Sequence, residues 1–272
     1  MPDISSQALS GVSETLLTTI YLRATESQRP DALIRDEKAV ALVKRIDYDF
    51  SRFKFGEDDQ VSIVLRTREL DRHARDFLAK YPEGVVVHIG CGLDTRFERV
   101  DNGKAEWYDL DLPDVIELRR KLIGDEGARY RLLACSVLDN TWLNTVSAHR
   151  QSAFLFLAEG VLQYFEEAQV KSLVLTLKER LPGSELVCDA VNPFMVWTSN
   201  LKLAFSKIGA RFHWGLKHGK DLEGWANGIR LLDEWFYFDR PEPRLGHQWM
   251  RHIPPLAKAS GIFHYQLGKA AR

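Results

Sequence analysis

From residue 84 onward, short apolar runs alternate with stretches of helical periodicity, and this alternation constrains the fold more than any other feature. Short apolar runs bounded by turn residues are typical of buried strands. The expected strands cover residues 85–89, 106–110, 130–134, 154–158, 185–190, 232–238 and 262–267, and the expected helices between them cover 113–123, 166–180 and 194–207. This order predicts an α/β fold with a doubly wound, mostly parallel seven-stranded sheet, in which the last two strands allow an antiparallel edge.

The first eighty residues lack this alternation and are predicted to be helical. Apolar residues recur at helical spacing over 15–24 and 59–80, and Asp36 is placed to cap a helix between them. We therefore expect an N-terminal helical segment over residues 1–82 and a core over 83–272. Because an open sheet leaves its ligand crevice exposed, the helical segment is expected to pack on the core as a lid.

Large aromatic residues are frequent between Asn192 and Arg251. Core packing and a late strand account for part of this content, and the wall of an apolar substrate pocket is the alternative. Residues 192–227 are accordingly predicted to form a substrate-side insertion before the last two strands.

Composition narrows the class of function. The chain has 272 residues, a formal net charge of −1, 45% hydrophobic residues and 28% charged residues, values that are ordinary for a globular protein. The near-neutral charge argues against nucleic-acid binding through phosphate contacts, and no apolar run approaches the roughly 18 residues of a spanning helix. The three cysteines form no C-x-x-C pair, which predicts neither a disulfide framework nor a metal site. Since the N-terminus is polar and lacks the basic residues of a signal peptide, we expect a cytoplasmic protein that binds neither membranes nor nucleic acid.

The most specific chemistry lies in the turn Gly90-Cys91-Gly92, which follows the first expected strand. Glycine tolerates positive φ and carries no Cβ, so a ligand can approach the backbone closely at this point. In open α/β sheets, nucleotide-like ligands lie just beyond the carboxyl end of the first strand. Residues 93–96 (Leu-Asp-Thr-Arg) follow where a dinucleotide-binding fold places a third glycine. A cofactor without a pyrophosphate does not need that glycine.

Carboxylates are expected at the same edge of the sheet. Asp109 and Asp111 end the second strand, about twenty residues after the turn, where an acidic residue can accept hydrogen bonds from both ribose hydroxyls. Glu159 follows the apolar strand 154–158, where a carboxylate loses solvation and usually has a partner. Structural roles are the alternatives: Asp94 could cap the following helix, Asp109 could pair with a surface arginine, and Glu159 could be an exposed loop residue.

Together these motifs resemble the leucine carboxyl methyltransferase family, in particular its bacterial branch of polyketide-type O-methyltransferases. The resemblance spans nearly the whole chain, and its motifs are His88-Ile-Gly-Cys-Gly-Leu-Asp-Thr-Arg96, Asp109-Leu-Asp-Leu-Pro-Asp114, Ala158-Glu-Gly-Val-Leu-Gln-Tyr164, and Tyr21-Leu-Arg-Ala-Thr-Glu26 followed by Arg35-Asp36. It implies the class I fold of S-adenosylmethionine-dependent methyltransferases, with S-adenosyl-L-methionine as the cofactor.

Matched residue by residue, the resemblance implies a cofactor site made of Arg66, Gly90, Asp111, Ser136, Val137 and Glu159. Gly90 would contact the cofactor through its backbone, and Asp111 would bind the ribose hydroxyls. Arg66 would pair with the methionine carboxylate, for which a guanidinium offers a two-pronged match.

The remaining roles concern the two ends of the cofactor. Ser136 and Val137 would flank the adenine. The family commonly has an acidic residue at the position of Ser136, whose hydroxyl can still bond the adenine amino group. Glu159 would face the ammonium or sulfonium end, where a negative charge is favourable. Tyr164 would lie near the reacting methyl group.

Methyl transfer is an in-line displacement, which needs the acceptor oxygen held about 3 Å from the methyl carbon and water excluded. A carboxylate acceptor is ionised at neutral pH and needs no base, whereas a phenol with a pKa near 10 would be helped by one. His213 is the first candidate for that base, with His218, His247 and His252 as further options. We predict an O-methyltransferase that acts, without a metal, on a small-molecule carboxylate or hydroxyl. An NAD(P)-dependent oxidoreductase and a non-catalytic cofactor-binding protein are the alternatives.

Overall fold

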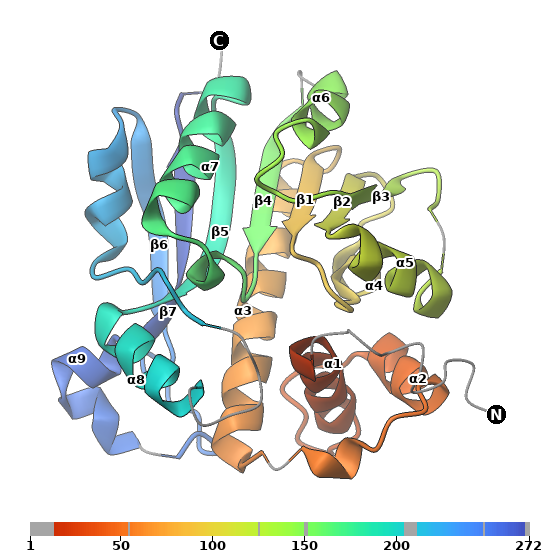
Figure 1. Ribbon diagram of the computed structural model, residues 1–272, viewed down its shortest axis with the longest axis vertical. Coiled ribbons are helices and arrows are strands. Elements are labelled where there is room, and N and C mark those ends of the chain that lie inside the picture. The colour runs from red at the N-terminus through yellow and green to blue at the C-terminus, as the bar shows by residue number, and fades with distance from the viewer. Residues whose placement is uncertain are drawn as a thin grey trace.

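A seven-stranded sheet runs through the described part of the chain, with helices packed on its two faces and a helical segment next to its carboxyl edge (Figure 1). The computed structural model describes residues 14–53, 55–124, 126–149, 152–203, 211–246 and 248–269. In the spatial order β3-β2-β1-β4-β5-β7-β6, the strands are β1 (Val85–Ile89), β2 (Glu106–Asp111), β3 (Tyr130–Ala134), β4 (Phe154–Ala158), β5 (Ser184–Val191), β6 (Ile229–Phe236) and β7 (Ser260–Leu267). The predicted doubly wound α/β sheet is confirmed.

The strand order reverses between β1 and β4, which places a ligand crevice outside their carboxyl ends. Strands β1 to β5 pair in parallel, and β7 is antiparallel to both of its neighbours, as expected for the edge. Ile89 pairs with both Leu110 and Ala158. The glycine turn, Asp111 and Glu159 therefore leave the sheet at the same level.

Strand β6 differs from the prediction, because it covers Ile229–Phe236 instead of 232–238. The aromatic residues near its end shifted the predicted strand toward the C-terminus. The strand begins in a polar segment, with Arg230 and Asp233 exposed, as is common for charged residues on an edge strand. It ends where Asp239 Oδ2 accepts the backbone N–H of Phe236 at 2.7 Å.

Each predicted helix has a counterpart in the described residues, which also contain three short helices that were not predicted. The helices are α1 (Glu14–Ser27), α2 (Glu37–Arg45), α3 (Glu57–Lys80), α4 (Arg96–Val100), α5 (Pro113–Leu122), α6 (Trp142–Val146), α7 (Glu167–Arg180), α8 (Pro193–Leu203) and α9 (Pro254–Ala257), with short 3-10 turns η2 (Phe50–Arg52), η3 (Ser147–His149), η4 (Leu162–Tyr164), η5 (Gly219–Trp225) and η6 (Gln248–His252). Asp36 caps α2 as predicted, since its carboxylate accepts the N–H of Ala39 at 2.9 Å. Residues 204–207 of the helix predicted over 194–207 lie outside the described residues. Within those residues no helix combines the length and the apolar character that a membrane crossing requires.

Apolar side chains on both faces of β1 enter the core, Val85 and Val87 on one side and Val86 on the other. A further cluster joins α1 to the core: Leu17 packs with Leu93, just after the glycine turn. The N-terminal helices are thus docked over the carboxyl edge of the sheet, beside the turn (Figure 1).

Candidate functional site

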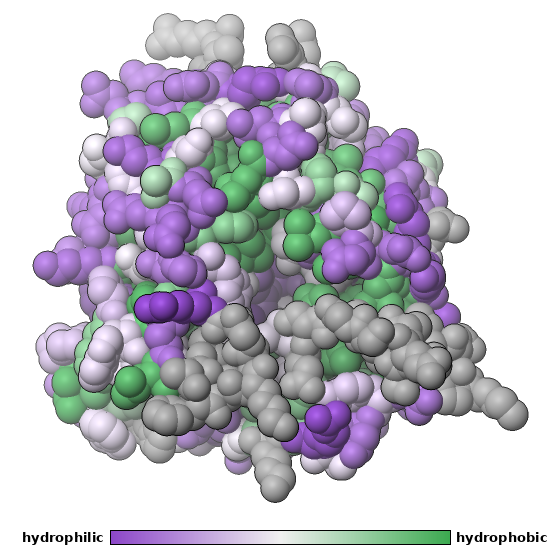
Figure 2. All heavy atoms as spheres, in the orientation of Figure 1, coloured by the Kyte–Doolittle hydropathy of each residue, from purple (hydrophilic) through white to green (hydrophobic). Residues whose placement is uncertain are grey.

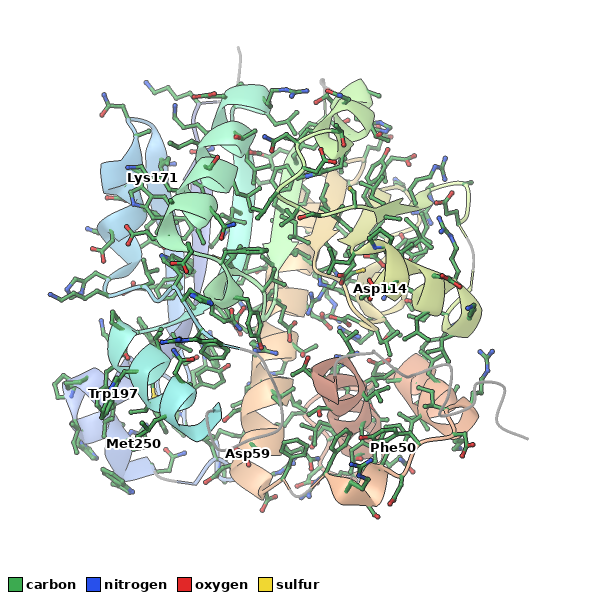
Figure 3. All side chains as sticks on the ribbon, viewed as in Figure 1. Phe50, Asp59, Asp114, Lys171, Trp197 and Met250 are labelled. Carbon is green, nitrogen blue, oxygen red and sulfur yellow. The ribbon has the colours of Figure 1, made fainter. Side chains whose placement is uncertain are left out.

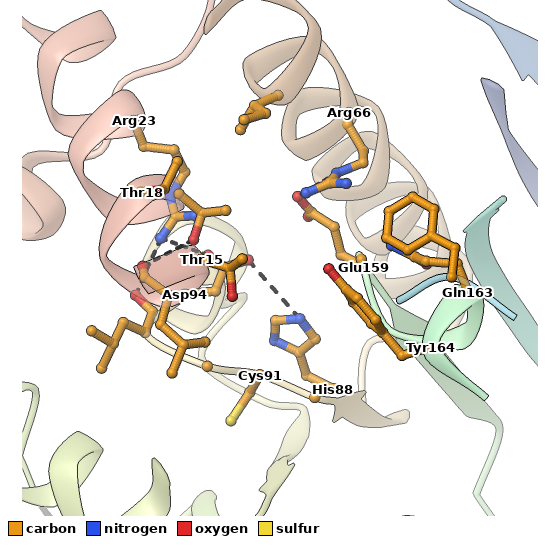
Figure 4. A pocket seen from close by; sticks show the side chains of 18 residues that line it. Thr15, Thr18, Arg23, Arg66, His88, Cys91, Asp94, Glu159, Gln163 and Tyr164 are labelled. Atoms are coloured by element: carbon orange, nitrogen blue, oxygen red, sulfur yellow. Dashed lines mark hydrogen bonds and ion pairs between the residues drawn. The ribbon is translucent and has the colours of Figure 1, made fainter. Parts of the chain in front are cut away.

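A cavity of about 260 Å³ lies at the carboxyl ends of β1 and β4, between α1, α3 and the loops that follow the two strands. This face of the molecule is hollowed near its centre, at the level of these strand ends (Figure 2). Arg66, Glu159 and Tyr164 lie on one side of the space in the close view, with Arg23 and Asp94 on the opposite side (Figure 4), and Gly90 also lines it. The other predicted site residues are not among those that line it: Asp111, Ser136, Val137 and His213.

Both glycines of the turn are required by conformation and by packing. Gly90 and Gly92 have φ values of 63° and 49°, in the left-handed region that favours glycine. A Cβ on Gly90 would lie 2.3 Å from Cγ2 of Val161, and a Cβ on Gly92 would lie 2.7 Å from Cδ2 of Leu16. The turn is therefore held closely between α1 and the loop after β4.

Asp111, at the end of β2, accepts a hydrogen bond from this turn. Its Oδ2 accepts the backbone N–H of Gly92 at 2.7 Å, and its Oδ1 accepts the N–H of Leu112 at 2.8 Å. Burial raises the pKa of the Asp111 carboxyl, against the effect of these two donors. The side chain is only partly buried, and a carboxylate has further lone pairs, so it can still accept bonds from a ligand.

Asp109, in contrast, is buried and has its partners in the protein interior. It forms a buried ion pair with Arg119 and accepts hydrogen bonds from Tyr130 at 2.6 Å and from Trp107 Nε1 at 2.8 Å. The sequence left open that Asp109 pairs with an arginine at the surface. Its partner is indeed an arginine, but Arg119 is buried. Of the two acids at the end of β2, Asp111 is the one with capacity for a ligand.

Glu159 is a buried carboxylate held between two arginines. Its Oε1 accepts bonds from Arg66 Nε and Thr67 Oγ1, both at 3.0 Å, and its Oε2 accepts a bond from Arg96. Burial alone would raise the pKa of Glu159, but Arg96 and Arg66 outweigh burial and lower the pKa to about 2. The alternative of an exposed loop residue is wrong, because Glu159 is a fixed negative charge in the cavity wall.

Arg66 reaches the cavity from α3 and bridges two strand ends. In addition to Glu159, it donates through Nη1 to Asp189 Oδ2 at 3.2 Å, and Asp189 Oδ1 accepts the N–H of Gly160 at 2.6 Å. The Arg66 side chain is 18% exposed and lines the cavity. It therefore presents a cation to a ligand, and its pairing with a methionine carboxylate stays a prediction.

Two arginines of α4 also belong to this site, although they were not predicted from sequence. Arg96 and Arg99 each donate through Nε to Asp71 of α3 at 2.7 Å, and they lie 3.1 Å and 2.9 Å from Asp94. Asp94 caps no helix, because α4 begins after Thr95, so the capping alternative is wrong. The signal in the sequence was the pair of arginines three residues apart, the first of them two residues after Asp94.

Arg23 ties α1 to the same network. Its Nε donates to Asp36 at 3.0 Å, its Nη2 donates to the carbonyl of Leu93 at 3.1 Å, and it lies 3.7 Å from Asp94 (Figure 4). The side chain is 2% exposed. One wall of the cavity is therefore fixed to the loop after β1 by buried, charge-assisted bonds.

Gln163 of the cavity wall carries a buried amide oxygen, Oε1, without a hydrogen bond among the described residues. Such an atom is rare in proteins and marks a place where a polar ligand completes the bonding. With the cation of Arg66 and the anion of Glu159, this wall fits the carboxylate and ammonium of a methionine moiety. The described residues contain no group of three or more His, Cys, Asp and Glu side chains that could hold a metal ion.

Ser136 and Val137 follow β3, two strands away from β1 along the same edge of the sheet. Ser136 Oγ accepts the N–H of Leu138 at 3.2 Å. Val137 is buried in the core, and its carbonyl accepts a bond from Trp142 Nε1 at 3.1 Å. Their proposed role beside the adenine stays a prediction.

The aromatic residues of the later chain divide into distinct groups. Phe212 lines the cavity and contacts Tyr164 edge to face, with ring centroids 5.2 Å apart, as expected of a pocket wall. Trp214 is buried in the core. Phe194 and Trp197 on α8 are 49% and 61% exposed. Trp197 is labelled in Figure 3.

His213 lies beside the cavity and not in its wall. Its Nδ1 is 2.7 Å from Oε1 of Glu166, and its backbone N–H donates to the carbonyl of Gln163 at 2.8 Å. His218 and His252 are also absent from the lining, and His247 lies outside the described residues.

Comparison with known proteins agrees with this geometry. Residues 16–178 match the family model for leucine carboxyl methyltransferases. The chain is 37% identical over 265 residues to the tetracenomycin polyketide synthesis O-methyltransferase TcmP of Streptomyces glaucescens, with 94% of this chain and 97% of that protein covered. It is 29% identical to the S-adenosyl-L-methionine-dependent methyltransferase dpfgK of Gibberella zeae, with 86% and 85% covered. Among solved structures, the chain resembles magnesium protoporphyrin IX methyltransferase (ChlM) from Synechocystis PCC 6803 with bound SAH, with a TM-score of 0.50. The match covers 93% of this chain and 99% of that one. At 12% sequence identity it shows a likeness of fold alone.

Proposed function

We propose that this chain, which belongs to the leucine carboxyl methyltransferase family and is an S-adenosylmethionine-dependent O-methyltransferase, methylates a small-molecule carboxylate. The membership decides against both the NAD(P)-dependent oxidoreductase and the non-catalytic binding protein. One observation carries the choice of acceptor: among the described residues that line the cavity, none is suited to take a proton from a weakly acidic hydroxyl.

The titratable residues of the wall support this choice. Glu159 and Asp94 have pKa values held low by arginines against the effect of burial, which makes both carboxylates weak bases. Burial raises the pKa of Tyr164, so its hydroxyl stays protonated at neutral pH. Nε2 of His88 lies 3.0 Å from Arg96 Nη1, and since a guanidinium only donates, that lone pair is occupied.

When bound, S-adenosylmethionine supplies an electrophilic methyl group; a C–O bond forms to the acceptor carboxylate as the C–S bond breaks, which yields a methyl ester and S-adenosylhomocysteine. The wall would hold the methionine end through Arg66, Glu159 and the backbone of Gly90. Asp111 would bind the ribose. Ser136 and Val137 would flank the adenine.

The other side of the cavity would receive the acceptor. Tyr164 and Phe212 offer an aromatic surface, which suits a compact apolar molecule and helps to exclude water. TcmP, by its name, serves polyketide synthesis. For this chain, an aromatic carboxylate would fit the surface of Tyr164 and Phe212. A hydroxyl acceptor is the second candidate, because His213 follows the cavity-lining Phe212 directly and could supply a base.

We also propose that residues 1–82 act as a lid on the core, 83–272, and that 192–227 form the substrate-side insertion. Leu16 and Thr19 of α1 and Phe212 of the insertion line the cavity, which supports both roles. Cys91, Cys135 and Cys188 are free thiols, which favours a cytoplasmic setting. The formal net charge of −1 argues against a nucleic-acid partner.

The test is methyl transfer from cofactor labelled in its methyl group to matched pairs of aromatic carboxylates and phenols. Mild alkali releases labelled methanol from a methyl ester and leaves an aryl ether intact. We expect alkali-labile product and, for the carboxylate, a kcat that stays level between about pH 6 and pH 9, where that acceptor is already ionised. Alkali-stable product, or a rate that rises tenfold per pH unit, would point to the hydroxyl acceptor.

A further inference from the structure

A second cavity, of about 430 Å³, lies where β5 ends, beside β6 and η5. It shares no lining residue with the first cavity in the described part of the chain. Its inner surface is apolar and consists of Leu216, Leu231, Phe236 and Phe263. Neither the cofactor residues nor the methyl-transfer chemistry makes use of this space.

The rim of the second cavity carries three lysines, namely Lys217, Lys220 and Lys258. The two carboxylates there already have partners in the protein. Asp221 Oδ2 accepts the backbone N–H of His218 at 2.9 Å, and Glu234 lies 3.8 Å from Lys258. Within the residues that the structure describes, Lys217 and Lys220 are exposed and form no ion pair with a carboxylate. Three lysines against the two carboxylates, Asp221 and Glu234, leave the rim with one net positive charge.

The wall of this cavity is held in place. The Tyr265 hydroxyl donates to the carbonyl of Gly219 at 2.8 Å and fixes the start of η5. A Cβ on Gly219 would lie 2.6 Å from Oε2 of Glu234 and 3.0 Å from Cδ1 of Phe263, so this wall is tightly packed. Lys258 lies over the Phe236 ring at 5.0 Å, which places a cation against the apolar surface. The space is thus preformed.

We propose that the second cavity binds a small organic anion with a flat apolar body. The apolar surface would bury the rings, and Lys217 and Lys220 would pair with a sulfonate, carboxylate or phosphate at the rim. Residues 211–216 separate this site from the catalytic one: Phe212 lines the first cavity, whereas Leu216, whose N–H donates to Val191 at 2.8 Å, lines the second. The two sites can therefore be occupied at the same time.

The experiment uses the full chain with saturating S-adenosylhomocysteine, which occupies the cofactor cavity. The probe is 8-anilinonaphthalene-1-sulfonate, followed by its fluorescence, and N-phenyl-1-naphthylamine serves as the same ring system without the charge. The variant is Lys217→Glu with Lys220→Glu, and Lys171→Glu on α7 is the matched exposed control (Figure 3).

We expect one sulfonate probe bound per chain, with a Kd that rises about tenfold or more in the double variant and stays unchanged in Lys171→Glu. Binding of the neutral probe should change less than twofold. The proposal is overturned if the double variant binds the sulfonate probe as tightly as the parent, or if the neutral probe loses affinity equally. It is also overturned if adding S-adenosylhomocysteine to a sample prepared without it displaces the probe.

Discussion

Nε of Arg66 donates to Oε1 of Glu159 at 3.0 Å and joins α3 to the loop after β4. The other oxygen of Glu159 binds Arg96 on α4, so one carboxylate connects two helices to the sheet edge at the candidate site. The charges proposed to receive the methionine end are therefore also the charges that hold the site together.

Replacing Glu159 with Gln should lower the free energy of unfolding by about 3 kcal/mol, because two largely buried guanidinium groups each lose one of their counter-charges. Urea denaturation measures this change. Glu117→Gln is the matched control, since Glu117 pairs with Lys121 on the exposed face of α5 and should matter little. Equal midpoints for Glu159→Gln and the parent would contradict a structural role for this carboxylate.

The ion pairs of Glu159 with Arg66 and Arg96 also predict that the free energy of unfolding depends on pH. The pKa of Glu159 is about 2 in the folded protein, against an ordinary value of 4.5. A depressed folded pKa stabilises the protein fully above about pH 4.5, and that stabilisation is lost as the pH falls toward 2. The difference in unfolding free energy between the parent and Glu159→Gln should therefore narrow over this range. A difference that stays constant from pH 5 down to the lowest pH at which both proteins fold would contradict the assignment.

Asp111→Asn should weaken the binding of S-adenosylhomocysteine by about ten- to a hundredfold, because charged hydrogen bonds to the ribose are lost. Isothermal titration calorimetry gives the affinity. Asp114→Asn, on the first turn of α5, is the control (Figure 3). Asp111 also holds the N–H of Gly92, so thermal unfolding should be followed in parallel. Undiminished affinity would show that the ribose is bound elsewhere.

Tyr164→Phe and His213→Gln separate the two catalytic candidates. Tyr164 lines the cavity, and loss of its hydroxyl should lower kcat by about three- to tenfold, the worth of one hydrogen bond. His213 pairs with Glu166 beside the cavity, so His213→Gln should leave kcat within about twofold with a carboxylate acceptor. A large loss in His213→Gln, greatest at low pH, would identify that histidine as a base.

Most of the sheet was predictable from sequence. Parallel strands covered on both faces are mostly apolar runs, so β1 and β4 begin and end where expected. The edge strand β3 also keeps its expected bounds, since three of its five residues are Leu and Ala. Strand β6 was displaced, because an edge strand carries exposed polar residues that weaken its periodicity.

The site was predictable where one strand leads directly into one functional residue. The glycine turn and Glu159 both follow this rule, since each ends a buried strand at the ligand edge. The partners of Glu159 were not predictable, because Arg66 and Arg96 come from α3 and α4, and only the packing of these helices brings them to the same carboxylate. The second cavity depends on how η5 crosses β6, which no local pattern encodes.

Helix α1 contributes Leu17 to a buried cluster and Leu16 to the cavity wall, so its docking and ligand binding share one surface. The two equilibria are therefore linked, and whatever binds between α1 and the glycine turn also opposes the undocking of the helix. Occupancy of the cavity should then slow amide hydrogen exchange along α1, with a protection that grows with ligand concentration.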